Sequence, residues 1–132
     1  MSNFKYQCIM LIDDSEIDNM VNKHILSKSN VAEKIIVFTT ANDALQYLEV
    51  NKNSTDATII PSVILLDINM PIMNGFGFLV EFEKLHNELL DVVNVIMLTS
   101  SVDPNDIRRS KEFVSVKSFI SKPLSLEHLD TI

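Results

Sequence analysis

The sequence predicts an α/β domain in which five parallel strands form one sheet with helices on both faces. Short apolar runs alternate along the chain with segments whose apolar residues recur at helical spacing, and this alternation is typical of a parallel sheet. The length of 132 residues fits one domain, and only two Gly and four Pro leave little room for linkers. We therefore expect a single domain over residues 1–132.

The expected strands are short runs rich in apolar residues, and the first, Cys8–Ile12, is apolar throughout, as in a strand that is buried on both faces. The first run stops at a pair of carboxylates and the third at another carboxylate, so polar residues mark the strand ends. The helices that connect parallel strands should cross over in the right-handed sense. The five runs are Cys8–Ile12, Ile35–Phe38, Ser62–Leu66, Val92–Leu98 and Val116–Ile120.

The first helix is expected to begin at Ser15. Asp18 follows three residues later, an arrangement that resembles a capping box. The apolar residues of this helix fall on one face, the pattern of a helix that packs on a core. They are Ile17, Met20, Val21 and Ile25.

Four further helices are expected. The second begins at Thr40, the fourth covers Asp103–Glu112, and the last, Ser125–Ile132, would be only about 12 Å long at 1.5 Å per residue. The polar loop Asn51–Ile60 is longer than a usual connection. The apolar positions of the second and third helices are Ala44, Leu45 and Leu48, and then Phe76, Leu79, Val80 and Phe82–Leu85.

Polar residues gather where the predicted strands end. Two orders are plausible for a doubly wound sheet, and the flavodoxin-like order 2-1-3-4-5 fits five strands. In that order ligands bind at the carboxyl ends, where strands 1 and 3 diverge. Three carboxylates, a hydroxyl and an ammonium group should then share one crevice: Asp13, Asp14, Asp67, Thr99 and Lys122.

The charges in this crevice predict a metal ion. Two carboxylates 4 Å apart repel by about 4 kcal/mol at an effective dielectric constant near 20. Lys122 offsets part of this cost, and a hard divalent cation would offset the rest. An all-oxygen site suits Mg²⁺ or Mn²⁺ rather than zinc. Such a site suits phosphoryl transfer, in which Asp67 supplies the attacking oxygen and Thr99 donates to a phosphoryl oxygen.

Composition excludes several other classes of protein. The net charge of −7 argues against nucleic acid or an anionic membrane surface as the main partner, since both require clustered cations. The apolar runs are too short to span a bilayer. No secretory signal is visible at the start of the chain, and Cys8 cannot form an internal disulfide because it is the single cysteine. We expect a cytoplasmic location.

Four sequence motifs, in order along the chain, resemble those of the receiver domain of two-component response regulators, the chemotaxis-receiver family. Each motif alone is weak, but all four at strand ends are specific. They are I-D-D at Ile12–Asp14, L-L-D-I-N-M-P at Leu65–Pro71 with N-G at Asn74–Gly75, L-T-S at Leu98–Ser100, and F-I-S-K-P at Phe119–Pro123.

The resemblance implies roles for the acidic residues and their neighbours. Asp67 matches the phosphoacceptor. Asp14 matches the residue that binds Mg²⁺ directly, and Asp13 one that acts through water. Asn69 matches the position whose backbone carbonyl is the third protein ligand of the metal.

The resemblance also implies a switch. Thr99 matches the switch hydroxyl and Phe119 the switch aromatic, here without the hydroxyl group of a tyrosine. Lys122 matches the lysine that pairs with the phosphoacceptor and its phosphoryl group. The Lys122–Pro123 peptide bond is expected to be cis.

The function that the resemblance implies is signalling. A sensor histidine kinase or a phosphotransfer protein would donate the phosphoryl group, and the domain would catalyse only its own phosphorylation and slow hydrolysis. The signal would pass to an unknown downstream protein, or to a homodimer formed through the fourth helix and fifth strand. The short last helix leaves two alternatives, a reduced face or a fragment of a longer regulator.

Three other functions fit the sequence less well. A haloacid-dehalogenase-type aspartyl-phosphate phosphatase would need a second Asp at position 69, where this chain has Asn69. A flavin carrier would need a phosphate-binding loop after strand 1, where Asp13 and Asp14 would repel phosphate. A pseudo-receiver that only binds partners is disfavoured by the complete acidic set.

Overall fold

The computed structural model describes residues 4–85, 87–101 and 103–132, and the expected domain over 1–132 also includes residues outside these ranges. Five parallel strands form one sheet in the order β2-β1-β3-β4-β5, so the predicted fold class is confirmed. The strands are β1 (Tyr6–Ile12), β2 (Ala32–Phe38), β3 (Val63–Leu66), β4 (Asn94–Thr99) and β5 (Val116–Ser121).

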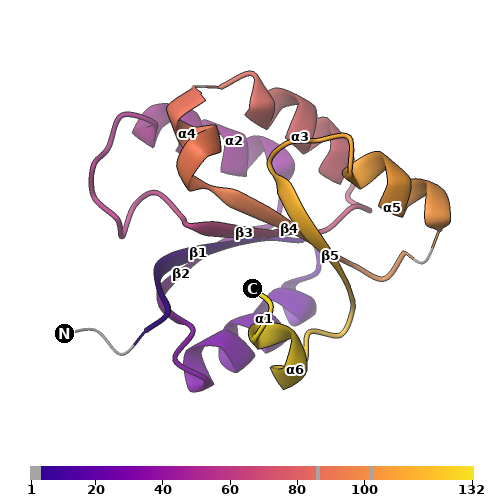
Figure 1. Cartoon of the computed structure of the whole chain (residues 1–132), viewed down its shortest axis with the longest axis horizontal. Helices are drawn as coiled ribbons and strands as arrows, with labels where there is room; N and C mark the ends of the chain where they lie inside the picture. The colour runs from indigo at the N-terminus through magenta and orange to yellow at the C-terminus, as the bar shows by residue number, and fades with distance from the viewer. Residues whose placement is uncertain (1–3, 86, 102) are drawn as a thin grey trace.

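Helices cover both faces of the sheet in two layers (Figure 1). In this view α2, α3, α4 and α5 lie above the sheet, and α1 and α6 lie below it. Among the described residues, no helix is long and apolar enough to cross a bilayer. The helices are α1 (Glu16–Lys28), α2 (Ala41–Asn51), α3 (Gly75–Glu83), α4 (Asn87–Val92), α5 (Pro104–Ser110) and α6 (Leu126–Leu129).

Each face of the sheet has its own apolar core. Side chains that alternate along a strand point to opposite faces, so Met10 and Ile12 join the core under α2 and α3, while Ile9 and Leu11 join the core over α1 and α6. Every residue of β3 is buried. The uninterrupted apolar runs in the sequence are explained by this burial on both faces.

The strand register aligns the ends of the central strands. Ile12 of β1 pairs with Leu66 of β3, and Leu66 pairs with Met97 of β4. The residue that follows each strand end therefore projects at one edge of the sheet. This register brings Asp13 next to Asp67, as the strand order predicted.

A helix that the sequence analysis missed precedes β4. Residues 87–92 form α4, and β4 begins at Asn94 instead of Val92. The amide of Val93 still donates to the carbonyl of Leu89, and both side chains are buried in the core under α2 and α3. The four-residue spacing of Leu89 and Val93 is helical, but a helix this short adds too few apolar positions to be distinguished from the apolar strand that follows it.

The two last helices are shorter than expected. α5 begins at Pro104 because Asp103 is its N-cap and accepts the amide of Asn105. α6 ends at Leu129, so the expected helix to Ile132 was wrong. Ile132 instead leaves the helical path and is buried beneath the sheet, where its carbonyl accepts the Tyr6 hydroxyl at 3.0 Å.

The expected buried face of α1 was wrong in part, because Ile25 packs against the core but Val21 is exposed. Ile17 and Met20 are 70% and 66% exposed, whereas Asn19, Asn22 and Leu26 are the buried residues of the helix. The Asn19 side-chain amide donates to the Asp13 carbonyl at 2.7 Å. Asn19 and the fully buried Leu26 therefore face the sheet, and Ile17 and Met20 lie at the surface.

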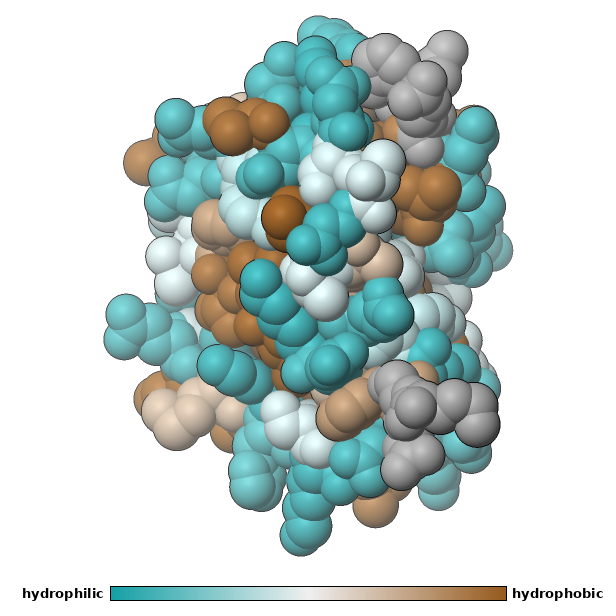
Figure 2. Space-filling view, turned by 90° about the vertical axis from the view of Figure 1, so that its left-hand side faces the viewer, coloured by the Kyte–Doolittle hydropathy of each residue, from teal (hydrophilic) through white to brown (hydrophobic). Residues whose placement is uncertain are grey.

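The long connection between α2 and β3 lies at the amino ends of the strands, opposite the predicted site. It projects on the left of Figure 1, and Figure 2 views this side, where brown apolar side chains lie among teal polar ones. The loop is ordered by its own hydrogen bonds, including those from Thr58 to the Asp56 carboxylate and from Tyr47 to the Ile59 carbonyl. With α4 it lines an open cavity of about 390 Å³.

Candidate functional site

Asp13 is fixed at the end of β1 by hydrogen bonds on three sides. Its amide donates to the Phe38 carbonyl, its Oδ1 accepts the Ser15 amide at 2.9 Å, and its carbonyl accepts the Asn19 side chain. Asp13 is 4% exposed, whereas Asp14 is exposed to solvent. The adjacent carboxylates therefore differ: one is buried and held, and the other faces the open crevice.

Asp67 lies at the end of β3, in the middle of the site. Its amide donates to the Ile12 carbonyl at 2.9 Å, and its side chain is 7% exposed. The following loop returns to the strand end, because the Gly75 amide donates to the Ile68 carbonyl. A Cβ atom on Gly75 would lie 2.5 Å from the Asp67 carbonyl oxygen, so this close approach requires glycine.

The three predicted carboxylates do converge. Oxygen atoms of Asp13, Asp14 and Asp67 lie within 4.8 Å of one another. This all-oxygen donor set fits a hard divalent cation such as Mg²⁺ or Mn²⁺. Both oxygens of Asp13 already accept hydrogen bonds, from Ser15 and Lys122, which suits contact with a metal through water. Of the three carboxylates, the exposed Asp14 is the most accessible to a metal ion.

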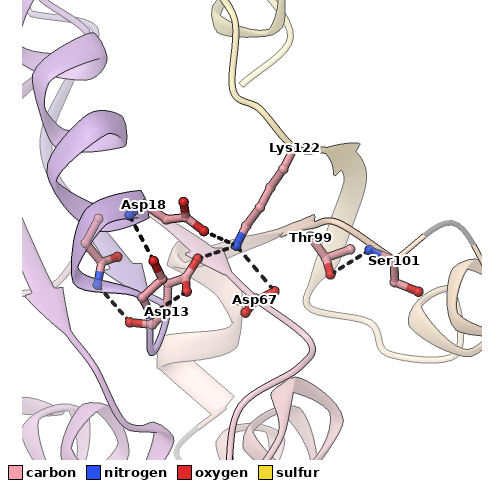
Figure 3. A network of polar contacts seen from close by, with 8 residues as sticks. Asp13, Asp18, Asp67, Thr99, Ser101 and Lys122 are labelled. Atoms are coloured by element: carbon pink, nitrogen blue, oxygen red, sulfur yellow. Dashed lines mark hydrogen bonds and ion pairs between the residues drawn. The ribbon is translucent and has the colours of Figure 1, made fainter.

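Lys122 reaches into the same crevice from the end of β5 (Figure 3). Its Nζ lies 2.6 Å from Asp13 Oδ2, 2.8 Å from Asp18 Oδ2 and 3.8 Å from Asp67 Oδ1. The ion pair with Asp67 is thus present but longer than the other two. The Lys122–Pro123 bond is cis, as expected.

Burial and neighbouring charges shift the pKa values of Asp67 and Lys122. Burial is the largest cause that raises the pKa of Asp67 from 3.8 to about 6, and the Asp13 charge adds to it. Lys122 and a hydrogen bond from Thr99 lower this pKa only in part. Burial alone would lower the pKa of Lys122, but its acceptors on Asp13 and Asp18 raise it above the usual value. The ammonium group therefore stays charged, and Asp67 carries negative charge that its surroundings compensate incompletely.

Thr99 ends β4 and is fully buried. Its Oγ1 accepts the Ser101 amide at 3.2 Å, and the Ser101 hydroxyl donates to Asp106 Oδ2 at 2.6 Å. Asp106 lies in the first turn of α5. Hydrogen bonds therefore connect the site hydroxyl to this helix.

Asn69 and Phe119 are the two remaining predicted site residues. Asn69 is exposed in the loop after β3, and its role as a carbonyl ligand stays a prediction. Phe119 of β5 is partly buried, pairs with Met97 and packs against the core under α2 and α3. Its role as a switch aromatic also stays a prediction.

Asp18 is a member of the site that the sequence motifs do not predict. Asp18 was interpreted only as part of a helix cap, and its amide does donate to the Ser15 hydroxyl. Its carboxylate, however, binds a lysine 104 residues away. A local pattern carries no signal for such a contact, although the neighbouring motif could have drawn attention to it.

The model of the response regulator receiver domain matches residues 9–132. The chain therefore belongs to the receiver domain family of two-component signalling. Members of this family are signalling domains that act with sensor histidine kinases and bind a divalent metal at a cluster of aspartates.

Known proteins similar to this chain agree with this membership. Response regulator Rcp1 of Synechocystis is 27% identical over 121 residues, which cover 92% of this chain and 80% of Rcp1. Sensor histidine kinase CheAY of Helicobacter pylori is 33% identical over 124 residues, which cover 94% of this chain and only 14% of CheAY.

Solved structures agree with the fold as well. A two-component response regulator from Cytophaga hutchinsonii superposes with a TM-score of 0.87 at 30% identity, covering 96% of this chain and 92% of that chain. The Mn²⁺-bound form of Rcp1 superposes with a TM-score of 0.73 at 26% identity, covering 95% of this chain and 87% of that chain.

Proposed function

We propose that this domain accepts a phosphoryl group on Asp67 from a phosphohistidine of a sensor histidine kinase or phosphotransfer protein. The observation that carries the proposal is the position of Asp67, buried beside Asp13, Asp14 and Lys122 at the edge where the strands end. A carboxylate surrounded in this way is the natural nucleophile of the crevice.

In the transfer, an oxygen of the Asp67 carboxylate attacks phosphorus. A P–O bond forms as the P–N bond to the donor imidazole breaks, and the imidazole nitrogen leaves with the electron pair and takes a proton from solvent. Lys122 contributes positive charge to the phosphoryl oxygens, and Thr99 can donate to one of them. Water later attacks the phosphorus, which releases inorganic phosphate and regenerates Asp67.

Mg²⁺, when bound, would neutralise charge on the phosphoryl oxygens. Asp14 and Asp67 would hold the ion directly, together with the Asn69 carbonyl, and Asp13 would act through water. Mn²⁺ is the alternative ion, and the Mn²⁺-bound form of the similar protein Rcp1 supports it. The exposed position of Asp14 leaves room for the waters that Mg²⁺ retains.

The surface beside the crevice supports a protein donor. Ile17, Met20 and Val21 of α1 are exposed close behind Asp13 and Asp14 in the chain, and Ile72 of the loop after β3 is 97% exposed. Apolar side chains at the rim of an acidic site suit docking of another protein. A cytoplasmic location belongs to this proposal, and the free, buried thiol of Cys8 agrees with it.

Phosphorylation of Asp67 by a small phosphodonor tests the assignment. With Mg²⁺ present, acetyl phosphate should add one phosphoryl group to the wild-type protein and none to Asp67→Asn, because the amide is not a nucleophile. Mass spectrometry and a radiolabel that alkali or hydroxylamine removes, as expected for an acyl phosphate, would measure this. The exposed Asp91→Asn is the control and should be labelled normally. Labelling of Asp67→Asn at the wild-type level, or labelling unaffected by a chelator, would contradict the proposal.

The output is proposed to pass through α5, β5 and α6. The hydrogen bonds from Thr99 through Ser101 to Asp106 offer a route from the site to α5. Movement of Thr99 toward a phosphoryl oxygen would break this connection and open space into which Phe119 can turn. Val114 and Leu126, 71% and 69% exposed, lie on this side and suit contact with a downstream protein or a second copy.

Thr99→Ala is therefore expected to separate phosphorylation from switching. The variant should still accept phosphate on Asp67, but its response to beryllofluoride, a phosphoryl mimic, should not reach Phe119 because the moving hydroxyl is gone. Amide shifts in NMR spectra would follow this, and sedimentation velocity would follow any dimer. Shifts at Phe119 that are equal in the variant and the wild type would rule out this route.

A further inference from the structure

The Lys122 ammonium group is held away from the proposed phosphoacceptor by two other carboxylates. Its distances to Asp13 and Asp18 are those of hydrogen bonds, whereas its distance to Asp67, 3.8 Å, is longer than a hydrogen bond. An ammonium group has three N–H donors. Two are used by these partners, and one remains for the side on which Asp67 lies.

The position of Asp18 is determined by the start of α1. Ser15 is the N-cap and accepts the Asp18 amide at 3.1 Å, while the Ser15 amide donates to Asp13. These bonds fix the backbone of Asp18 relative to the end of β1. The Asp18 side chain points across the crevice to Lys122, as Figure 3 shows.

Asp13 alone would hold Lys122 less firmly. A lysine side chain is long and flexible, and a single partner leaves its ammonium group free to swing toward the Asp67 carboxylate, which lies 3.8 Å away. A close Lys122–Asp67 pair would neutralise the attacking oxygen and occupy the space that the phosphoryl oxygens need. A second anchor on α1 prevents this approach.

We infer that Asp18 is a positioning residue that holds Lys122 off Asp67 and so keeps the phosphoacceptor free for attack. This inference rests on the proposed phosphorylation of Asp67. Asp18 does not belong to the cluster of Asp13, Asp14 and Asp67 that would hold the metal.

Three variants test the inference. Asp18→Asn removes the charged anchor, and Asp18→Glu retains it. Glu16→Gln is the matched control, because Glu16 also lies in the first turn of α1, is exposed and loses the same unit of charge. Helix-dipole and net-charge effects are therefore shared by Asp18→Asn and Glu16→Gln, but the contact with Lys122 is lost only in the former.

Two readouts are needed. In metal-free protein, the ¹⁵N-detected ammonium resonance of Lys122 should be protected in the wild type and in Glu16→Gln, and shifted or lost through exchange in Asp18→Asn. With acetyl phosphate and Mg²⁺, Asp18→Asn should be phosphorylated about tenfold more slowly, because a displaced ammonium group no longer meets the phosphoryl oxygens in the productive geometry. Asp18→Glu should recover much of this rate, and the Mg²⁺ affinity should change less than twofold.

The outcomes distinguish the two proposals. If the wild-type protein is labelled on Asp67 and Asp18→Asn is labelled as fast as Glu16→Gln, the proposed role of Asp18 is wrong, but the proposed function is not. An unchanged ammonium resonance in Asp18→Asn leads to the same conclusion. A wild-type protein that takes no phosphoryl group overturns the proposed function, and this inference with it.

Discussion

Gly75→Ala is expected to lower the free energy of unfolding by about 3 kcal/mol, the upper range for forcing atoms into a packed site. The new Cβ would lie 2.5 Å from the Asp67 carbonyl oxygen and 3.0 Å from the Ile68 Cα. Both are backbone atoms, so no side-chain rotation relieves the clash, and the end of β3 must move. Urea unfolding followed by circular dichroism would measure the loss.

Gly77→Ala is the matched control for this prediction. Its Cβ would meet the Met73 side chain at 2.9 Å, and that side chain is flexible. Alanine also favours the helix by up to about 1 kcal/mol, which offsets the displacement of Met73. We expect stability within about 1 kcal/mol of the wild type. Equal destabilisation by the two substitutions would mean that the close approach at Gly75 is unimportant.

Asp67→Asn is expected to stabilise the metal-free protein at neutral pH. The folded protein holds the Asp67 pKa near 6, above the ordinary value of 3.8, so the folded state binds the proton more tightly than the unfolded state. Stability therefore falls as the pH rises from about 4 to about 6, because ionisation is more costly in the folded protein. Asparagine carries no charge and avoids this cost.

The size of this effect should depend on pH. A rise of two units in the Asp67 pKa corresponds to a gain of about 3 kcal/mol in the free energy of unfolding of Asp67→Asn at pH 7.5. About half of this gain should remain at pH 5. Urea unfolding in the presence of a chelator would measure both values, with Asp91→Asn as a surface control. Mg²⁺ should stabilise the wild type more than the variant, since Asp67 is a proposed ligand. A gain that is the same at both pH values would exclude a shifted pKa of Asp67 as its cause.

Most of the site could be predicted from the sequence because parallel strands end at one edge. Asp13, Asp67 and Thr99 each follow an apolar run, and any sheet of order 2-1-3-4-5 brings those positions together. The helix N-caps at Ser15 and Thr40 could also be predicted, since an N-cap hydrogen bond joins residues only three positions apart.

Other features depend on contacts between distant segments. The sequence of α1 shows apolar residues at Ile17 and Met20, but the helix packs with Asn19 and Leu26 toward the sheet, so Ile17 and Met20 face solvent. Short helices such as α4 bury only a few residues, and their pattern merges with that of the adjacent strand.

The sequence by itself determined the fold class and the residues of the crevice, since both follow from local periodicity and from the positions where strands end. Only the tertiary structure decided how the charges in the crevice are paired. Asp18 and Lys122 are 104 residues apart and meet because α1 and β5 flank the same edge of the sheet. The partner of a lysine depends on distances of a few ångströms between separate elements, and no local pattern in the chain specifies those distances.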